Sequence, residues 1–379
     1  MRILLVGEYN RTHKSLKEGL VELGHEAIVL GLTDGFKKVD VDIEINNKFQ
    51  SGINKKIRAL YYRIFNSDIY SKEVLKQIKS KHHLLKGFDV VQFVNESPFL
   101  CLPKIEEEIF NLLIKWNGKP FLLSCGTDFP SVKYAFDKKF RYSILTPFFE
   151  GRVNKSDFSL GLKYLRPDFV RLHKHIYHKI AGVISCDLDY YLPLQGNNKH
   201  IGMIPHAINT AKIKFMELEV NDKIVIFHGI NRRNYFKKGN DIFEGALEIV
   251  KEKFSHKIEI ITVENLPYKD YLLAFDRAHI LLDQVYAYDQ GYNALEAMAK
   301  GKVVFTGAEK EWLDYYNLEE DKVAINALPN EEKVAEKLIW LIENRNKILK
   351  ISREARLFVE RYHGHLVCAE KYLNLYRAN

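Results

Sequence analysis

Residues 280–305 constrain the fold of this chain more than any other stretch. An apolar run at 279–283 leads into a polar loop over 288–293, and a helical pattern follows over 293–300. Gly301 then precedes a second apolar run. A helix that connects two apolar strands is typical of a parallel sheet covered by helices. The segment therefore predicts an α/β architecture.

The same alternation of strand and helix patterns occurs in both halves of the chain. Apolar runs predict strands at 2–7, 26–32, 88–94, 120–124, 181–186, 201–205, 223–229, 257–263, 279–283 and 322–326. Amphipathic patterns predict helices at 12–24, 52–86, 167–181, 239–253, 267–277, 330–344, 346–362 and 364–377, and residues 130–160 are aromatic-rich without a regular pattern.

The pattern restarts near residue 223, which predicts two Rossmann-like, doubly wound domains that face a central cleft. We place the first domain at 1–205 and the second at 206–363, with a C-terminal helix of about 364–379 packing back on the first. Ligands of such sheets bind beyond the carboxyl ends of the strands, so the cleft is the expected site.

Composition excludes several classes of protein. The chain has 379 residues, 46% of them hydrophobic, which suits two cored domains. No apolar run reaches the roughly 18 residues of a membrane-spanning helix, and no signal-peptide pattern precedes the first strand, so we expect a cytoplasmic protein. The first βαβ unit lacks the G-x-G-x-x-G motif, so the sequence does not support a dinucleotide-binding fingerprint there. The scattered cysteines 101, 125, 186 and 368 are expected to be buried free thiols.

The charge of the chain is concentrated in one segment. Residues 48–86 contain ten Lys or Arg and two acidic residues, a difference of +8 that equals the net charge of the whole chain. Such a segment attracts phosphate groups on an anionic membrane surface, a lipid pyrophosphate or a nucleic acid. Within it, the helix predicted at 52–86 has Ile57, Leu60, Tyr61, Ile64 and Phe65 on one face, so it is either a surface helix packed on its own core or an interfacial helix resting on acidic lipid.

The loop and helix of the opening segment fit the chemistry of a nucleotide sugar. A diphosphate favours free backbone N–H groups at a helix N-terminus, and Gly291 allows a close approach of the backbone there. A ribose diol favours a carboxylate that accepts from both hydroxyls, and Glu296 in the first turn of the helix could supply it. The alternative is that Glu296 only stabilises the helix dipole.

Leu295-Glu296-Ala297-Met298-Ala299, followed by Gly301, resembles the L-E-A-M-A-x-G-x-P-V block of the group 1 (family 4) glycosyltransferases of the GT-B fold. The likeness extends to the P-N-G-V-D turn at 205–209, to the G-R…K-G strip at 229–239 and to the G-S-D loop at 126–128. It implies two Rossmann-like domains, a nucleotide-sugar donor on the second and an acceptor on the first. It also implies retention of anomeric configuration, no metal or other cofactor, and a role in the synthesis of cell-surface polysaccharides or glycans.

The sequence departs from that family at one position. The family pattern is E-x7-E, but the residue eight positions before Glu296 is Tyr288. The first glutamate of the family contacts the donor sugar, so Asp283 or Asp289 could supply the carboxylate instead. The resemblance assigns donor binding to the segment around the helix start and to two further positions: Tyr288, Asp289, Gly291, Tyr292, Asn293, Glu296, Gly229 and His206.

Cations are expected to stabilise the leaving nucleotide. Arg gives bidentate contacts with phosphate and Lys gives a point charge. Lys238 and either Arg232 or Arg233 follow the strand at 223–229, where the carboxyl ends of the strands open. Asp128 is the candidate for orienting an acceptor hydroxyl, with a turn residue as its alternative.

Other polar groups favour structural roles. Asp187 follows a strand, so helix capping explains the Asp187-x-Asp189 pair better than a metal site, and the pair at Asp40 and Asp42 arises easily by chance. The three histidines at 173, 175 and 178 do not have the spacing of a ligand set. His206 is a candidate either for donor phosphate or for packing between domains.

The sequence thus predicts a hexosyltransferase-like enzyme that moves a sugar from a nucleotide diphosphate onto a saccharide or lipid-linked acceptor. It would act in the cytoplasm or at the inner membrane surface, which the segment 48–86 would face. The alternatives are a non-catalytic nucleotide- or saccharide-binding protein, which Tyr288 favours, and a sugar-nucleotide epimerase. Nucleic-acid binding is not expected, because no known motif accompanies the basic segment.

Overall fold

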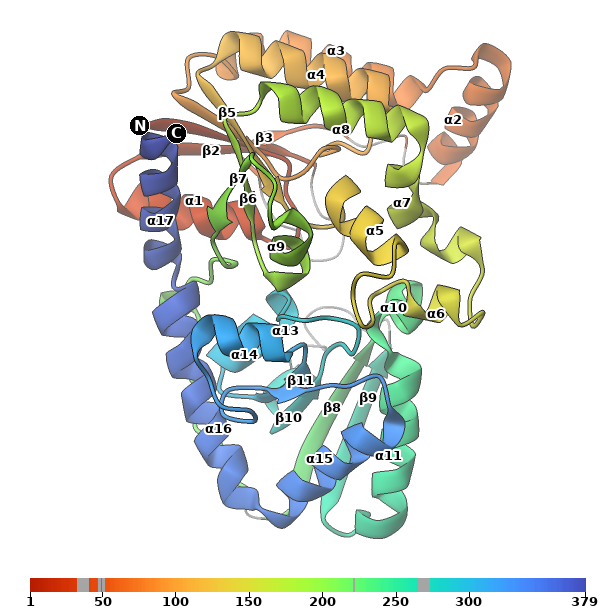
Figure 1. Ribbon diagram of the computed structural model, residues 1–379, viewed down its shortest axis with the longest axis vertical. Helices are drawn as coiled ribbons and strands as arrows, with labels where there is room; N and C mark the ends of the chain where they lie inside the picture. The colour runs from red at the N-terminus through yellow and green to blue at the C-terminus, as the bar shows by residue number, and fades with distance from the viewer. Residues whose placement is uncertain (33–40, 47–48, 50–51, 221, 265–272) are drawn as a thin grey trace.

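Two parallel β-sheets, each covered by helices, form the two halves of the computed structural model (Figure 1). The structure describes residues 1–32, 41–46, 49, 52–220, 222–264 and 273–379. This arrangement confirms the predicted fold class.

The first sheet has seven parallel strands in the order β3-β2-β1-β4-β5-β6-β7. Its strands are β1 (Arg2–Val6), β2 (Glu26–Gly31), β3 (Ile43–Glu44), β4 (Val90–Phe93), β5 (Lys119–Ser124), β6 (Gly182–Ser185) and β7 (His200–Met203). The central strands are apolar at nearly every position because helices cover both faces of the sheet. The two-residue strand β3 was not predicted, since it is too short to give a pattern.

The helices of this half are α1 (Thr12–Glu22), α2 (Gly52–Phe65), α3 (Ile69–Ser80), α4 (Pro103–Trp116), α5 (Phe129–Phe136), α6 (Thr146–Phe149), α7 (Ser159–Leu162), α8 (Pro167–Lys179) and α9 (Leu188–Leu194). The prediction of one helix over 52–86 was wrong, because the chain turns at Asn66, which has a positive φ, and starts again after Asp68. Residues 130–160 contain short helices rather than irregular chain.

Helix α2 extends away from the body of the first half (Figure 1). None of its residues is buried. Its exposed apolar side chains include Ile57, Leu60, Ile64 and Phe65. The interpretation of this segment as a helix packed on its own core was therefore wrong for α2. None of the described helices combines the length and hydrophobicity that crossing a lipid bilayer requires.

The second sheet has five parallel strands in the order β12-β11-β10-β8-β9. Its strands are β8 (Ile224–Ile230), β9 (Ile258–Glu264), β10 (Ile280–Leu282), β11 (Val303–Thr306) and β12 (Ile325–Asn326). Its helices are α10 (Tyr235–Lys238), α11 (Asn240–Phe254), α13 (Tyr292–Ala299), α14 (Lys310–Tyr316), α15 (Glu331–Glu343) and α16 (Arg345–Phe358). Of the helix predicted at 267–277, residues 267–272 lie outside the described residues and 273–276 are helical.

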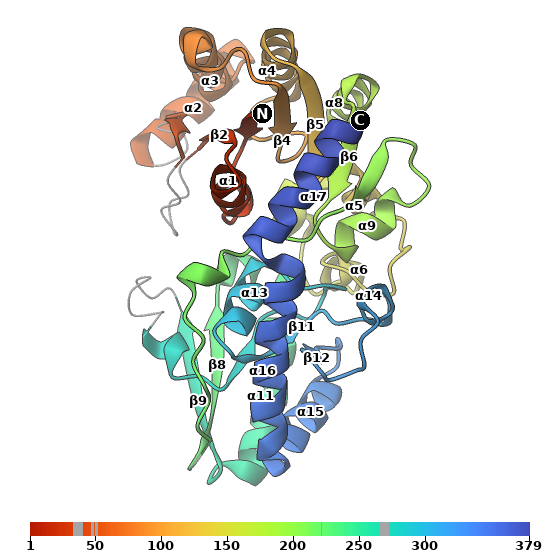
Figure 2. The same ribbon diagram turned by 90° about the vertical axis from the view of Figure 1, so that its left-hand side faces the viewer.

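The chain crosses between the two halves twice, and the two crossings are hydrogen-bonded to each other. Ile208 donates its N–H to His363 at 2.7 Å and accepts from the N–H of His365 at 3.0 Å. After a π-helical turn at Val359–His363, helix α17 (His365–Ala378) returns to the first half and packs against α1 (Figure 2). A Cβ on Gly19 of α1 would lie 2.3 Å from the carbonyl oxygen of His365, so only glycine allows this approach.

Helix α17 completes the apolar core on one face of the first sheet. Its buried residues Cys368, Tyr372 and Tyr376 pack with apolar side chains of β1 and β5. The hydroxyl of Tyr376 donates to the side chain of Gln92 at 2.7 Å. The predicted domain boundary at 205/206 falls in the connection between β7 and β8.

Candidate functional site

A cavity of 430 Å³ lies between the carboxyl ends of the two sheets. The first half contributes the start of α1, the Gly126–Thr127 turn and the aromatic segment 140–161. The second half contributes Asn234 and Lys237 and the loop that leads into α13. Mixed polar and aromatic walls of this kind suit an elongated organic ligand with polar ends.

Helix α13 begins at the cavity wall. Gly291 is its N-cap and lines the cavity, and its φ of −81° is an ordinary value, so glycine is not required there for backbone geometry. A Cβ at this position would meet only the side chain of Gln284, at 3.8 Å. The absence of a side chain thus leaves the N–H groups of the first helical turn accessible from the cavity.

Glu296 is the fifth residue of α13, so the expectation that it lies in the first turn was wrong. Its carboxylate lies 3.1 Å from Arg11 Nη1, which belongs to the first half of the chain. Both side chains keep some solvent exposure. An ion pair of this kind contributes about 0–1 kcal/mol. A ligand that offers two hydroxyls to the carboxylate could therefore displace Arg11 at small cost.

Lys238, Asp283 and Asn293 form a group behind the helix start. Nζ of Lys238 lies 2.8 Å from Asp283 Oδ1, and the amide of Asn293 donates to the same oxygen at 3.0 Å. Asp283 follows β10 and is buried, whereas Lys238 is partly exposed. The buried carboxylate fixes the direction of the lysine ammonium group.

The remaining predicted cations lie further out. Arg232 pairs with Glu264 and stacks on the ring of Tyr235 at 4.8 Å, and Arg233 is exposed. Gly229 lies within β8, paired with Val263 of β9. Lys237, which the sequence prediction did not choose, lines the cavity. Burial lowers the pKa of Lys237.

Tyr288, at the position where the resembled family has its first glutamate, is buried and does not line the cavity. Its hydroxyl accepts from the N–H of Arg141 at 2.8 Å, and the guanidinium of Arg141 lies 4.8 Å from its ring. Its ring also packs against Phe140 and Tyr142. In this structure Tyr288 joins the two halves of the protein.

Asp289 lines the cavity and lies among other carboxylates. It accepts from the N–H of Leu188 at 3.1 Å and from that of Gln290 at 2.7 Å. Burial, followed by the charge of Asp187, raises the pKa of Asp289 to about 7. Burial also raises the pKa of Asp189, which accepts from the N–H of Tyr288.

His206 lies at the first crossing between the halves and lines the cavity. Its Nε2 is 3.4 Å from Asp187 Oδ2. Burial lowers the pKa of His206, but the ion pair with Asp187 and the nearby thiol of Cys125 outweigh burial and raise the pKa above its ordinary value. The prediction that Asp187 caps a helix is confirmed, because its side chain accepts from the N–H of Tyr190 at the start of α9.

Asp128 is fully buried and caps α5. It accepts from the N–H of Ser131 at 2.9 Å and from the hydroxyl of Ser124. Burial, followed by the charge of Glu96, raises the pKa of Asp128 to about 6. The neighbouring Thr127, not Asp128, lines the cavity. The acceptor role of Asp128 stays a prediction.

Tyr292 ties the two halves together at the cavity wall. Its buried hydroxyl donates to the carbonyl oxygen of Ala207, and the carbonyl oxygen of Arg11 lies 3.2 Å away. Its ring centroid lies 5.1 Å from that of His206.

The three histidines of α8 have different surroundings. His173 pairs with Glu96, His175 bonds Asn111 at 2.8 Å, and His178 is exposed. Asp40, of the other Asp pair, lies outside the described residues. All four cysteines are buried and free, as predicted.

Several cavity residues were missed by the sequence prediction: Tyr9, Thr12, Thr127, Tyr190, Lys237 and Gln284. Most of them come from the first half, where the loop at 126–128 was the one motif and Asp128 was the residue chosen from it. Lys237 lies next to the predicted Lys238, and only the short helix α10 decides which of the two lines the cavity.

No protein-family model and no curated protein sequence matches the chain. Solved structures do match over its whole length. Sucrose-phosphate synthase from Thermosynechococcus elongatus has a TM-score of 0.62 at 14% identity, covering 100% of this chain and 99% of that one. HepE of Anabaena in complex with UDP-glucose has a TM-score of 0.58 at 12% identity, covering 100% of both chains.

The chain has the GT-B fold. A protein from Listeria monocytogenes named for UDP-N-acetylglucosamine 2-epimerase activity is also similar, with a TM-score of 0.52, 11% identity and 98% and 95% of the two chains covered. At these identities the likeness concerns the fold, which different chemistries share.

Proposed function

We propose that the protein is a glycosyltransferase that moves a sugar from a nucleoside-diphosphate sugar onto a saccharide or lipid-linked acceptor. The observation that carries the proposal is the 430 Å³ cavity between the carboxyl ends of two parallel sheets. HepE, which has the same fold, holds UDP-glucose in its crystal structure. Such a cavity offers one wall to each of two substrates.

The donor would bind to the second half. The N–H groups at the start of α13 face the cavity beside Gly291 and suit a diphosphate. Glu296 would accept both ribose hydroxyls after leaving Arg11, and the freed guanidinium would then be available to a phosphate.

The acceptor would bind to the first half. This wall combines the hydroxyls of Thr127 and Ser131 with the apolar side chains of Leu145, Phe158 and Leu160. Hydroxyl groups suit a saccharide, and the apolar side chains suit a sugar face or a lipid portion.

The reaction would need no metal ion at the diphosphate. The charge that develops on the leaving nucleotide would be offset by Lys237 at the cavity and by Lys238, which Asp283 holds in place. Arg232 and Arg233 would add to the positive potential at the cavity mouth. Retention of anomeric configuration is part of this proposal and rests on the sequence resemblance alone.

A thermal-shift series with UDP, GDP and ADP, followed by nucleotide release from the matching sugars, tests the proposal. The correct nucleotide should stabilise the protein by mass action. Glu296→Gln should weaken its binding by about 10- to 100-fold, because a hydrogen bond to a charged group contributes about 1.5–3 kcal/mol. Glu336→Gln on the surface of α15 is the matched control. Unchanged nucleotide binding in Glu296→Gln would refute the proposal that Glu296 binds the ribose hydroxyls. If none of the nucleotides stabilises the protein, the proposal that it is a glycosyltransferase is refuted.

A sugar-nucleotide epimerase is the second candidate, because the epimerase-named Listeria protein has a similar fold. An epimerase converts its nucleotide sugar without an acceptor, whereas a transferase leaves the sugar unchanged until an acceptor is added. Sugar analysis after incubation with the donor alone separates the two.

We further propose that α2 docks on an anionic membrane surface. Its apolar side chains are exposed along with Lys55, Lys56 and Arg63. Arg58 is held by a bidentate pair with Asp68, at 2.7 Å for each contact, which ties the helix to the start of α3. A basic helix with an exposed apolar face gains free energy by lying in the headgroup region. The protein would then act as a peripheral membrane enzyme, with a lipid-linked acceptor within reach.

A further inference from the structure

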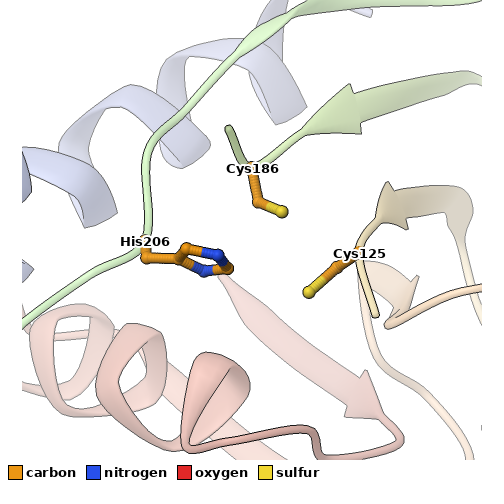
Figure 3. Close-up of side chains that lie close together, drawn as sticks. All are labelled: Cys125, Cys186 and His206. Carbon is orange, nitrogen blue, oxygen red and sulfur yellow. The ribbon is translucent and has the colours of Figure 1, made fainter. Parts of the chain in front are cut away.

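Two cysteines that are distant in sequence meet at the carboxyl ends of neighbouring strands. Ser124 of β5 and Ser185 of β6 are register partners, and Cys125 and Cys186 are the next residues of those strands. Side chains at matching positions of adjacent parallel strands point to the same face. The two thiols therefore lie together, and Figure 3 shows both on the same side of the ring of His206.

The three side chains form a compact buried group. Sγ of Cys125, Sγ of Cys186 and a ring nitrogen of His206 all lie within 4.8 Å of one another. All three residues are buried. His206 is fixed from behind, because its carbonyl oxygen accepts from His363 Nδ1 at 3.0 Å. Rigid placement of donor atoms favours binding of an ion.

Asp187 supplies a fourth donor atom to the same group. Its Oδ2 lies 3.4 Å from His206 Nε2 and 3.6 Å from Cys186 Sγ. In a tetrahedral zinc site, metal–ligand bonds of about 2.0–2.3 Å place the ligand atoms roughly 3.3 to 3.8 Å apart. The separations from Asp187 Oδ2 to His206 Nε2 and to Cys186 Sγ already have these lengths, and the two sulfur atoms and a ring nitrogen of His206 lie within 4.8 Å of one another.

A cation suits the charge of this group. Metal-bound cysteines are thiolates, so two thiolates and the carboxylate of Asp187 would lie together in a buried place, where a zinc ion offsets their charge.

We propose that Cys125, Cys186 and His206 bind a zinc ion, with Asp187 as the fourth ligand. Binding releases the thiol protons to solvent and joins the ends of β5 and β6 to the crossing segment between the two halves. Because Cys125, Asp187 and His206 also line the cavity, zinc occupancy would set the shape of that wall. The proposal is independent of the sugar-transfer reaction, whose leaving group needs no metal in our account.

Metal binding to the full-length protein tests this site. After treatment with a chelator under reducing conditions, the protein should take up about one Co²⁺ per chain, with a thiolate-to-cobalt charge-transfer band that Zn²⁺ abolishes. X-ray absorption at the zinc edge of the wild-type protein should give two sulfur ligands at about 2.3 Å. This measurement needs no variant and therefore does not depend on the folding of one.

Variants then locate the site. Cys125→Ala and Cys186→Ala should each abolish the charge-transfer band, whereas Cys101→Ala, a buried thiol elsewhere in the same half, should leave it intact. Asp187→Asn can still cap α9 and should weaken zinc binding by about 10- to 100-fold. Absence of metal–sulfur ligation in the wild-type protein would overturn the proposal. So would a band that survives both cysteine variants, or an intact mass that indicates a disulfide between the two thiols.

Discussion

Replacing apolar residues of α2 by serine should detach the protein from anionic membranes without unfolding it. Leu60, Ile64 and Phe65 are 59%, 63% and 61% exposed, so the fold loses little when they change. Full burial of such a side chain contributes about 1.5–3 kcal/mol. Transfer of the exposed three-fifths into lipid therefore contributes about 1–2 kcal/mol for each residue and about 3–5 kcal/mol for the three.

Each 1.4 kcal/mol changes an equilibrium constant about tenfold. The triple variant should thus bind vesicles about two to three and a half orders of magnitude more weakly than the wild type. The assay is co-sedimentation with vesicles of phosphatidylglycerol and phosphatidylcholine, compared with vesicles of phosphatidylcholine alone. Binding should also weaken with added salt, because each cation near an anionic surface contributes about 1 kcal/mol.

A matched pair of single variants separates the effect of a position on α2 from the general effect of replacing an exposed leucine by serine. Leu60→Ser should lower the partition coefficient about 5- to 30-fold, on the basis of about 1–2 kcal/mol. Leu357→Ser changes a residue of α16 that is 58% exposed and should have no effect. Equal losses in both variants, or a wild-type protein that ignores anionic vesicles, would refute the reasoning.

Three further predictions concern the cavity and the stability of the first half. Lys237→Ala should weaken binding of the nucleoside diphosphate about 10- to 100-fold, as titration calorimetry would measure. Lys238→Ala should lower turnover more than donor binding, as steady-state kinetics would measure. Burial raises the pKa of Glu106 to about 7. The stability that its protonated carboxyl contributes to the fold is therefore fully present below about pH 4.5 and is lost as pH rises through 7. In urea unfolding, Glu106→Gln should remove a change of about 3 kcal/mol in the free energy of unfolding across this pH range. Gly19→Ala should destabilise the fold by about 1–3 kcal/mol because its Cβ meets the backbone of α17, as thermal unfolding would measure. Gly161→Ala, whose Cβ would make only an ordinary van der Waals contact with Thr127 at 3.9 Å, should be nearly neutral.

The sequence predicted the buried strands well because parallel strands covered on both faces are continuous apolar runs. β1, β4 and β8 are of this kind. The prediction from sequence failed where the folded chain divides one continuous amphipathic pattern into two helices. The helix predicted at 52–86 combined two helices of similar composition, and only the left-handed residue Asn66 and the capping position of Asp68 separate them.

Helix α4 shows a signal that was present and not used. Glu106, Ile109, Phe110 and Leu113 have the i, i+3, i+4, i+7 spacing of a buried helical face, and Pro103 is its first residue. The charged residue at the first of these positions conceals the pattern, because a glutamate is rarely buried.

The site was predicted best where one loop carries it. Gly291 and Asp289 line the cavity, since both belong to the loop that enters α13. Tyr288 could not be placed from sequence, because its partners Arg141 and Phe140 lie nearly 150 positions away. The Cys125–Cys186 pair escaped for the same reason: register between β5 and β6 brings the thiols together, and no local spacing records that register.

The position of α17 has a consequence for how the protein is made. Its residues complete the core of the sheet formed by the first 203 residues, and Tyr372 and Tyr376 are buried there. During synthesis one apolar face of that sheet stays only partly covered, by α1, until residues 365–378 leave the ribosome. The first half therefore cannot mature before the second, and a chain arrested before residue 365 should be a substrate for chaperones rather than a stable half-protein.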